Sequence, residues 1–240
     1  MRLHGTRTGR AALAFLIALL PLRVLADSPE ESSRDQFKRT FQKTVALKPG
    51  QKLRIEHSNG TIKIRTQKES QVSISATIRV SSSDVEGARR FSEGIQISVE
   101  ESPAGVSVVT RYPEKNWSFL GRGFVSYSVD YDIVMPETAL LDTRNKFGNV
   151  DVSGLKASAD IKNSNGSIDF RDGRGAQRLE NSFGKIELAR NDGNATVVNS
   201  NGSVTVSDLG GELDLVNRFG TVSASRLKGR SRISNSNGSV

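Results

Sequence analysis

The carboxyl-terminal part of the chain alternates apolar and polar residues with period two on both sides of a recurring turn. The turn has the sequence Asn-x-(Phe or Asn)-Gly, called the signature below. It recurs with an 18-residue period, at Asn145, Asn163, Asn181, Asn199, Asn217 and Asn235. Apolar residues stand two positions before most of these asparagines, and two and four positions after most of the glycines. The spacing predicts a unit of strand, glycine turn, strand and second loop.

One such unit buries too little apolar surface to fold alone, whereas stacked units form a continuous core and pair their strands. A helical repeat would place apolar residues about 3.6 apart, and these residues do not follow that spacing. We therefore predict an all-β protein whose residues 143–240 form a regular parallel β-solenoid (β-helix) of 18-residue repeats, open at its C-terminal end. We expect right-handed coiling, the default for parallel crossovers.

The third signature position is alternately phenylalanine and asparagine along the chain, which gives a longer, 36-residue period. The phenylalanines are Phe147, Phe183 and Phe219. If one solenoid turn is a single 18-residue unit, the two residue types alternate up one column. If it spans two units, each type forms its own column. Like-on-like stacking favours the longer turn, but the few apolar positions per unit fill only a small cross-section, and we favour the 18-residue turn.

The signature asparagines and glycines are interpreted as turn formers without a ligand role. Glycine adopts backbone angles closed to other residues, and asparagine tolerates the left-handed region. Stacked identical asparagines are also able to form an amide ladder along the axis.

Residues 46–142 are predicted to form an irregular β-rich first part of the solenoid. Within them, residues 53–64 fit the repeat frame, with His57 in the asparagine column and Gly60 in the turn. One short helix is expected to open at Ser83 and to end near Gly94. Further strands are predicted by alternation at 71–80, 95–100, 106–112 and 125–134. We expect the segment between residues 67 and 135 to cap or decorate the first coil.

Residues 1–26 have the layout of an export signal, with three early arginines, an apolar run at 11–20 and a cleavage site after Ala26. The run is too short to span a bilayer, although an uncleaved anchor is the alternative. Residues 27–45 are polar and charged, and we expect a flexible leader there. The predicted location is therefore outside the cytoplasm: periplasmic, on the cell surface or extracellular.

Removal of the signal also weakens the basic character of the chain. The whole sequence has 34 Lys and Arg against 26 Asp and Glu, but four arginines leave with residues 1–26, so 30 against 26 remain. A net charge of +4 on an exported chain argues against nucleic acid as a partner. The absence of cysteine excludes disulfides, thiolate metal sites and a thiol nucleophile.

The segment Val125-Ser-Tyr-Ser-Val-Asp-Tyr-Asp-Ile-Val-Met-Pro136, followed by the Asn-x-Phe-Gly and Asn-Ser-Asn-Gly units, resembles the bacterial putative-adhesin domain family of unknown function, with its β-strand repeats. The resemblance runs from about Lys48 to the last residue. It implies an exported β-solenoid and an envelope or extracellular setting. It implies no catalytic residues.

We predict a non-catalytic cell-envelope protein, which is adhesin-like or a scaffold or ligand-sensing module, without cofactor or metal. His57 is the one histidine outside the signal, and it replaces a turn asparagine. The alternative is a polysaccharide lyase or hydrolase, which requires carboxylates on one face. Asp151, Asp169 and Glu187 share a column, and we interpret them as a solvated strand exterior.

Two groups of residues are candidate contacts with an envelope or surface partner, whether a glycan or another protein. The candidate polyanion contact, favoured by local positive charge, comprises Arg218, Arg226, Lys228, Arg230 and Arg232. The same charges would also deter pairing at the open C-terminal coil, where a capping partner is a further expectation. The candidate aromatic contact comprises Trp117, Phe119 and Phe124, whose alternative role is to cap the first coil. Membrane contact is expected only through the signal or at the periphery.

Overall fold

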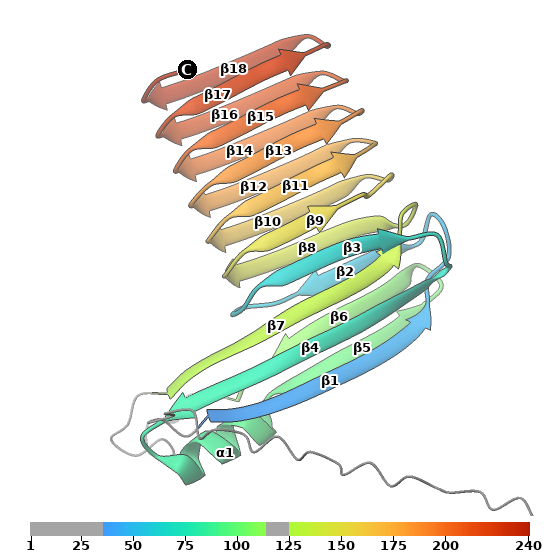
Figure 1. The fold of residues 1–240 in the computed structure, drawn as a ribbon, viewed down its shortest axis with the longest axis vertical. Helices are drawn as coiled ribbons and strands as arrows, with labels where there is room; N and C mark the ends of the chain where they lie inside the picture. The colour runs from blue at the N-terminus through green and yellow to red at the C-terminus, as the bar shows by residue number, and fades with distance from the viewer. Residues whose placement is uncertain (1–35, 114–124) are drawn as a thin grey trace, which may run out of the picture. The chain divides into compact units, whose positions relative to one another are not determined.

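The computed structural model describes residues 36–113 and 125–240, whose strands form two nine-stranded sheets (Figure 1). In spatial order, sheet A contains β1 (Gln36–Ala46), β4 (Gln71–Ser82), β7 (Val125–Pro136), β3 (Ile62–Gln67), β9 (Val150–Ser153), β11 (Ile168–Gly173), β13 (Ile186–Asn191), β15 (Val204–Leu209) and β17 (Val222–Leu227). Sheet B contains β18 (Ser231–Asn237), β16 (Leu213–Phe219), β14 (Ala195–Asn201), β12 (Gln177–Phe183), β10 (Ala159–Asn165), β8 (Leu140–Phe147), β2 (Lys52–Glu56), β6 (Gly105–Arg111) and β5 (Gln96–Ser102). The predicted all-β solenoid is confirmed.

Each coil of the regular region is one 18-residue repeat, with one strand in each sheet. Strand β10 pairs in parallel with β12, so that Asn163 lies opposite Asn181 and Asn165 lies opposite Phe183. Phenylalanine and asparagine therefore alternate up one column, and the shorter of the two predicted turns is confirmed. The small cross-section is filled by a few inward columns, and Phe170 is the largest side chain that is completely buried there.

The signature turns stack so closely that a side chain on the glycine would collide with the coil below. Gly166 has φ +123°, and a Cβ at this position would lie 2.3 Å from the carbonyl oxygen of Gly148. Its backbone N–H donates to the carbonyl of Phe183 in the next coil at 2.9 Å. Glycine is thus required both by the backbone angle and by the close approach.

The signature asparagines point inward and bind the turns of neighbouring coils. The amide of Asn163 donates to the carbonyl of Gly148 at 3.0 Å. Higher in the stack, Asn199 donates to the side-chain oxygen of Asn217 at 3.2 Å, and Asn217 donates to Asn235 at 3.1 Å. The expected amide ladder therefore exists in this part of the stack.

The stacking order differs from the chain order at the N-terminal end of the described region. Strands β2 and β3 form a coil that pairs in parallel with β8 and β9, as the repeat frame of residues 53–64 predicted. Strands β6 and β7 pair with the other side of that coil, although they follow it in the chain. The antiparallel pairs β4–β7, β1–β4 and β5–β6 continue the two sheets beyond it, as expected for a decorating segment.

The prediction of a flexible leader over residues 27–45 is wrong for its second half, because β1 begins at Gln36. This strand pairs antiparallel with β4 over its whole length. Its Phe37 and Phe41 pack against the core, and Val45 is buried. The apolar residues are too widely spaced to signal a strand alone, and a long partner strand supplies the missing hydrogen bonds and contacts.

Helix α1 (Val85–Gly94) packs against β4 and β1 (Figure 1). The predicted helix is confirmed, but its N-cap is Asp84 rather than Ser83: the Asp84 carboxylate accepts from the backbone N–H of Gly87 at 3.0 Å. Its Phe91 ring lies 4.8 Å from the Tyr127 ring. No helix among the described residues is long and apolar enough to cross a membrane.

Candidate binding surface

The signature turns of six successive coils line up along one edge of the stack, called the turn edge here. It comprises residues 146–149, 164–167, 182–185, 200–203, 218–221 and 236–239. Each of these segments lies between an inward asparagine and an inward apolar residue or the chain's last valine. The side chains between them point to solvent because the turn leaves the core at both ends.

Three phenylalanines stand exposed on the turn edge. Phe147 is 54% exposed, Phe183 is 56% and Phe219 is 41%. They belong to one column and to every second coil, so neighbouring rings are about 9.5 Å apart, which is two strand spacings. Large apolar side chains exposed in register are not needed by the core and are typical of contact sites.

The asparagines that alternate with the phenylalanines in this column include two whose side chains bond to the backbone of the preceding coil. The amide of Asn165 donates back to the carbonyl of Lys146 at 3.4 Å, and that of Asn237 donates to Arg218 at 3.3 Å. The column continues downward with Asn59, which pairs with Phe147 across the coil of β2 and β3. The edge therefore alternates exposed rings with amides, which are half-buried at Asn59, Asn165 and Asn201 and exposed at Asn237.

Cations accompany only the phenylalanine turns. Lys146, Lys185 and Arg218 stand one in each of them, whereas all three asparagine turns have the sequence Asn-Ser-Asn-Gly-Ser. No segment of the turn edge contains a carboxylate. The Arg218 guanidinium lies 5.2 Å from the centre of the Phe219 ring, and Lys185 contacts Glu187, outside the edge, at 2.9 Å.

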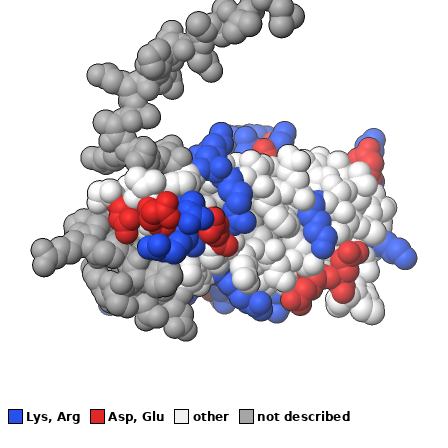
Figure 2. Space-filling view, turned by 90° about the horizontal axis from the view of Figure 1, so that it is seen from below, with Lys and Arg blue, Asp and Glu red and all other residues white. Residues whose placement is uncertain are grey.

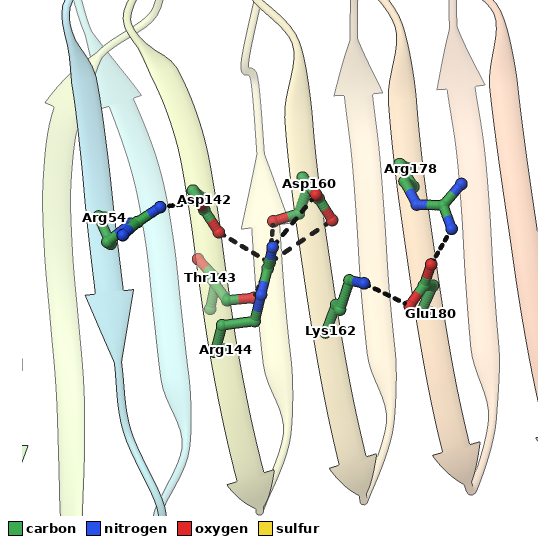
Figure 3. Close-up of polar contacts among 8 residues, drawn as sticks. All are labelled: Arg54, Asp142, Thr143, Arg144, Asp160, Lys162, Arg178 and Glu180. Atoms are coloured by element: carbon green, nitrogen blue, oxygen red, sulfur yellow. Dashed lines mark hydrogen bonds and ion pairs between the residues drawn. The ribbon is translucent and has the colours of Figure 1, made fainter.

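The outer face of sheet B is charged but largely self-neutralised (Figure 3). Asp142, only 9% exposed, contacts Arg54 at 3.2 Å and Arg144 at 2.7 Å. Arg144 reaches on to Asp160 at 3.2 Å. In a neighbouring group, Glu180 contacts both Lys162 and Arg178. These side chains pair with one another both within a strand and across adjacent strands, which favours a structural role over a binding role.

A second column, at the corner opposite the turn edge, was not found by sequence reasoning. Asp172, Arg190, Asp208 and Arg226 recur with the same 18-residue period and all adopt left-handed backbone angles, with φ from 53° to 59°. Arg190 pairs with Asp172 at 2.5 Å, and Arg226 pairs with Asp208 at 2.5 Å. The alternating signs at fixed spacing were the available signal. A non-glycine residue incurs backbone strain in this conformation, and at these four positions an ion pair to the neighbouring coil accompanies it.

The five residues of the candidate polyanion contact lie at two corners. Arg218 is on the turn edge, whereas Arg226, Lys228, Arg230 and Arg232 surround the second loop at the other end of the strands. Arg226 pairs with Asp208, and Arg232 lies in register with Asp214 on β16. The neighbouring coil thus places an acidic residue beside two of these cations. A polyanion contact at this corner remains a prediction.

On the face drawn in Figure 2, basic and acidic residues lie beside one another in groups, and uncharged surface separates the groups. That face shows no continuous field of one sign. The candidate aromatic contact of Trp117, Phe119 and Phe124 lies outside the described residues.

The carboxylate column is formed as expected, with Asp151 beside Asp169 and Asp169 beside Glu187. Burial, and then the neighbouring Asp169 carboxylate, raise the pKa of Asp151. Asp169 is paired with Arg171, and Glu187 is paired with Lys185. Among the described residues, no cluster of three or more metal-ligating side chains occurs.

His57 is buried and lies in the asparagine column, as predicted. Its Nδ1 lies 3.1 Å from the Thr110 hydroxyl, which also contacts the Tyr131 hydroxyl at 2.6 Å. Burial lowers the pKa of His57 to about 4, with partial compensation from nearby backbone carbonyls and Asp130. A neutral imidazole packed among Tyr112 and Tyr131 fits a core position.

No family model matches the sequence, and no curated protein does. Solved structures align with most of this chain. A putative cell adhesion protein from Clostridium sporogenes aligns with a TM-score of 0.41 and 11% identity, over 84% of this chain and 99% of that one. A putative adhesin from Bacteroides fragilis aligns with a TM-score of 0.38 and 14% identity, over 82% and 97%. A putative lipid binding protein from Parabacteroides distasonis aligns with a TM-score of 0.34 and 10% identity, over 84% and 96%.

Proposed function

We propose that this protein is an exported, non-catalytic binding module of the cell envelope, adhesin-like in action, that contacts its partner through the turn edge. The observation that carries the proposal is the column of Phe147, Phe183 and Phe219, exposed in register on a rigid stack. These rings lie outside the core, so their apolar surface is removed from water only when a partner covers it.

The chemistry elsewhere supports binding rather than catalysis. The one histidine outside residues 1–26 is buried among tyrosines. The Asp169 and Glu187 carboxylates are held by cations, so they are poorly placed to act as a glycosidase pair. Export is supported by the charge and apolar pattern of residues 1–26.

Binding is tested with the full chain, fluorescently labelled and titrated onto whole bacterial cells and isolated envelopes. The variant Phe147→Asn/Phe183→Asn/Phe219→Asn places in each phenylalanine turn the residue that the neighbouring coils already carry. We expect this variant to lose roughly a hundredfold or more in affinity, since each of the three buried aromatics contributes on the order of 1 kcal/mol.

Val216→Asn is the matched control, because Val216 is 45% exposed on the outer face of sheet B, away from the edge. It should bind like the unmodified protein. Equal binding by the triple variant, or loss confined to Val216→Asn, would contradict the proposal. Circular dichroism and thermal unfolding of all variants show whether the fold is retained.

Export is tested separately by fusing residues 1–45 to a reporter enzyme that is active only outside the cytoplasm. We expect activity with residues 1–45 and none when residues 1–26 are removed. Activity in neither fusion would refute export while leaving the binding test unaffected.

A further inference from the structure

Resting on the proposed function, we infer that the turn edge binds a linear acidic polysaccharide with a two-sugar repeat, laid along the stack so that one repeat spans two coils. The site consists of Phe147, Phe183 and Phe219 with their three accompanying cations and the intervening serine and asparagine turns.

The period of the edge is the first reason. Turns with one phenylalanine and one cation recur in every second coil, or about every 9.5 Å along the axis, because strands stack about 4.7–4.9 Å apart. This is close to the length of one extended two-sugar unit. The cation precedes the ring at Lys146 and Arg218 and follows the glycine at Lys185. A ligand whose chemistry alternates sugar by sugar would meet one ring and one cation at every repeat.

The composition of the two turn types is the second reason. A phenylalanine ring offers an apolar face to the C–H side of a sugar ring. The adjacent cation is placed to form a charge-assisted hydrogen bond with a carboxylate of the same repeat. The Asn-Ser-Asn-Gly-Ser turns between them carry only hydroxyl and amide groups, which suit the hydroxyls of the second sugar.

The sign of the charge is the third reason. The turn edge contains Lys146, Lys185 and Arg218 and no carboxylate. Among the described residues, Lys146 has no ion-pair partner and the Arg218 guanidinium lies over the Phe219 ring, whereas Lys185 is paired with Glu187 outside the edge. An acidic polymer complements this edge, whereas an acidic ligand on sheet B would have to displace existing ion pairs.

A second copy of the chain is a poorer occupant, although its geometry fits. Two edges placed antiparallel would set each phenylalanine opposite an asparagine. However, both edges carry the same positive charge, and three half-exposed rings per copy bury only a few hundred Å². A stable dimer buries about 1,200–2,000 Å².

The test measures binding of the full chain to hyaluronan oligosaccharides of increasing length by calorimetry. These have a two-sugar repeat with one carboxylate. Neutral chitin oligosaccharides and polyglutamate serve as comparisons for the sugar and the charge alone. We expect affinity to rise with each added repeat up to three, the number of phenylalanine turns, and then to level off, with weak binding of both comparison ligands.

Three variants locate the site. Phe183→Asn should weaken binding roughly tenfold, as expected for one lost stacking contact. Lys146→Ser/Lys185→Ser/Arg218→Ser, which copies the serines of the neighbouring turns, should weaken it further and remove most of the salt dependence. Neutralising Arg226, Lys228, Arg230 and Arg232 to glutamine removes more charge from the opposite corner and should leave the affinity unchanged.

Four results would overturn the inference. These are loss of binding only on neutralising the opposite corner, equal binding of polyglutamate, affinity independent of oligosaccharide length, and dimerisation that the Phe183→Asn variant abolishes. If no oligosaccharide binds while phenylalanine-dependent binding to envelopes persists, the ligand class is wrong and the proposed function stands. If envelope binding is also independent of the phenylalanines, both fail.

Discussion

Individual buried polar side chains join one coil to the next. The signature asparagines donate to glycine carbonyls or to one another, and several of these bonds cross a coil boundary. His57 occupies the same column in the coil of β2 and β3, where a larger ring is accommodated beside Thr110, Tyr112 and Tyr131. Since an uncharged imidazole is required there, this position makes stability depend on pH.

The pKa of His57 falls from 6.5 to about 4 on folding because the ring is buried. Between these values the unfolded chain binds a proton that the folded chain does not. Stability is therefore lost as the pH falls from 6.5 towards 4, and this contribution is constant below 4. We expect the unmodified protein to lose about 3 kcal/mol more than His57→Asn over that interval. Urea denaturation at both ends of the interval measures the difference, and identical losses would refute it.

Among strands and turns, the glycine turns determine how closely the coils approach. In each signature turn the glycine combines a positive φ with contact to the carbonyl of the glycine below. At the opposite corner the chain also turns through left-handed backbone angles, but there Asp and Arg residues adopt them and form ion pairs between coils. The left-handed positions at the opposite corner therefore accept long side chains, although a Cβ on Gly193, Gly211 or Gly229 of the same loop would also collide with the coil below.

Gly166→Ala should destabilise the fold by about 3 kcal/mol or more, because it adds both backbone strain and a collision with the carbonyl of Gly148. Gly50→Ala is the control, since Gly50 also has a positive φ, +79°, but nothing lies within 4 Å of the added Cβ. It should cost only about 1–2 kcal/mol. Chemical denaturation compares the two, and equal losses would show that the close approach contributes nothing.

The regular coils together form a one-dimensional stack in which each coil contacts only its neighbours. Charge, exposure and hydrogen bonding all repeat along it, and the turn edge adds a period of two coils. Removing whole repeats should therefore shorten the stack without changing the architecture.

Deletion of residues 163–198 removes two complete coils and keeps the alternation of phenylalanine and asparagine turns. We expect a folded protein with lower thermal stability. Deletion of residues 163–189 removes one and a half coils, joins the wrong sheet positions and should not fold cooperatively. Circular dichroism melts distinguish the two, and equal behaviour would contradict the coil assignment.

The residues of the candidate site can be recognised in the sequence, but the sequence does not indicate that they form an exposed contact surface. The alternation of Phe147, Asn165 and Phe183 is evident there, where it bears only on the size of a coil. The turn lies between two inward positions, so its exposure follows from the pattern once the 18-residue coil is known. The grouping of Arg218 with residues 226–232 follows their closeness in sequence, whereas a strand carries them to opposite corners.

Period-two alternation and glycine spacing are local properties that every coil repeats, so the amino-acid sequence alone specifies the solenoid, its repeat and the inward columns. It also places residues 53–64 in the frame. Long-range contacts set the rest: β2 and β3 lie between coils distant in the chain, β1 completes a sheet, and particular charges neutralise one another. These outcomes depend on segments far apart in sequence, because the partner of an edge strand or an exposed cation is not encoded in its own neighbourhood.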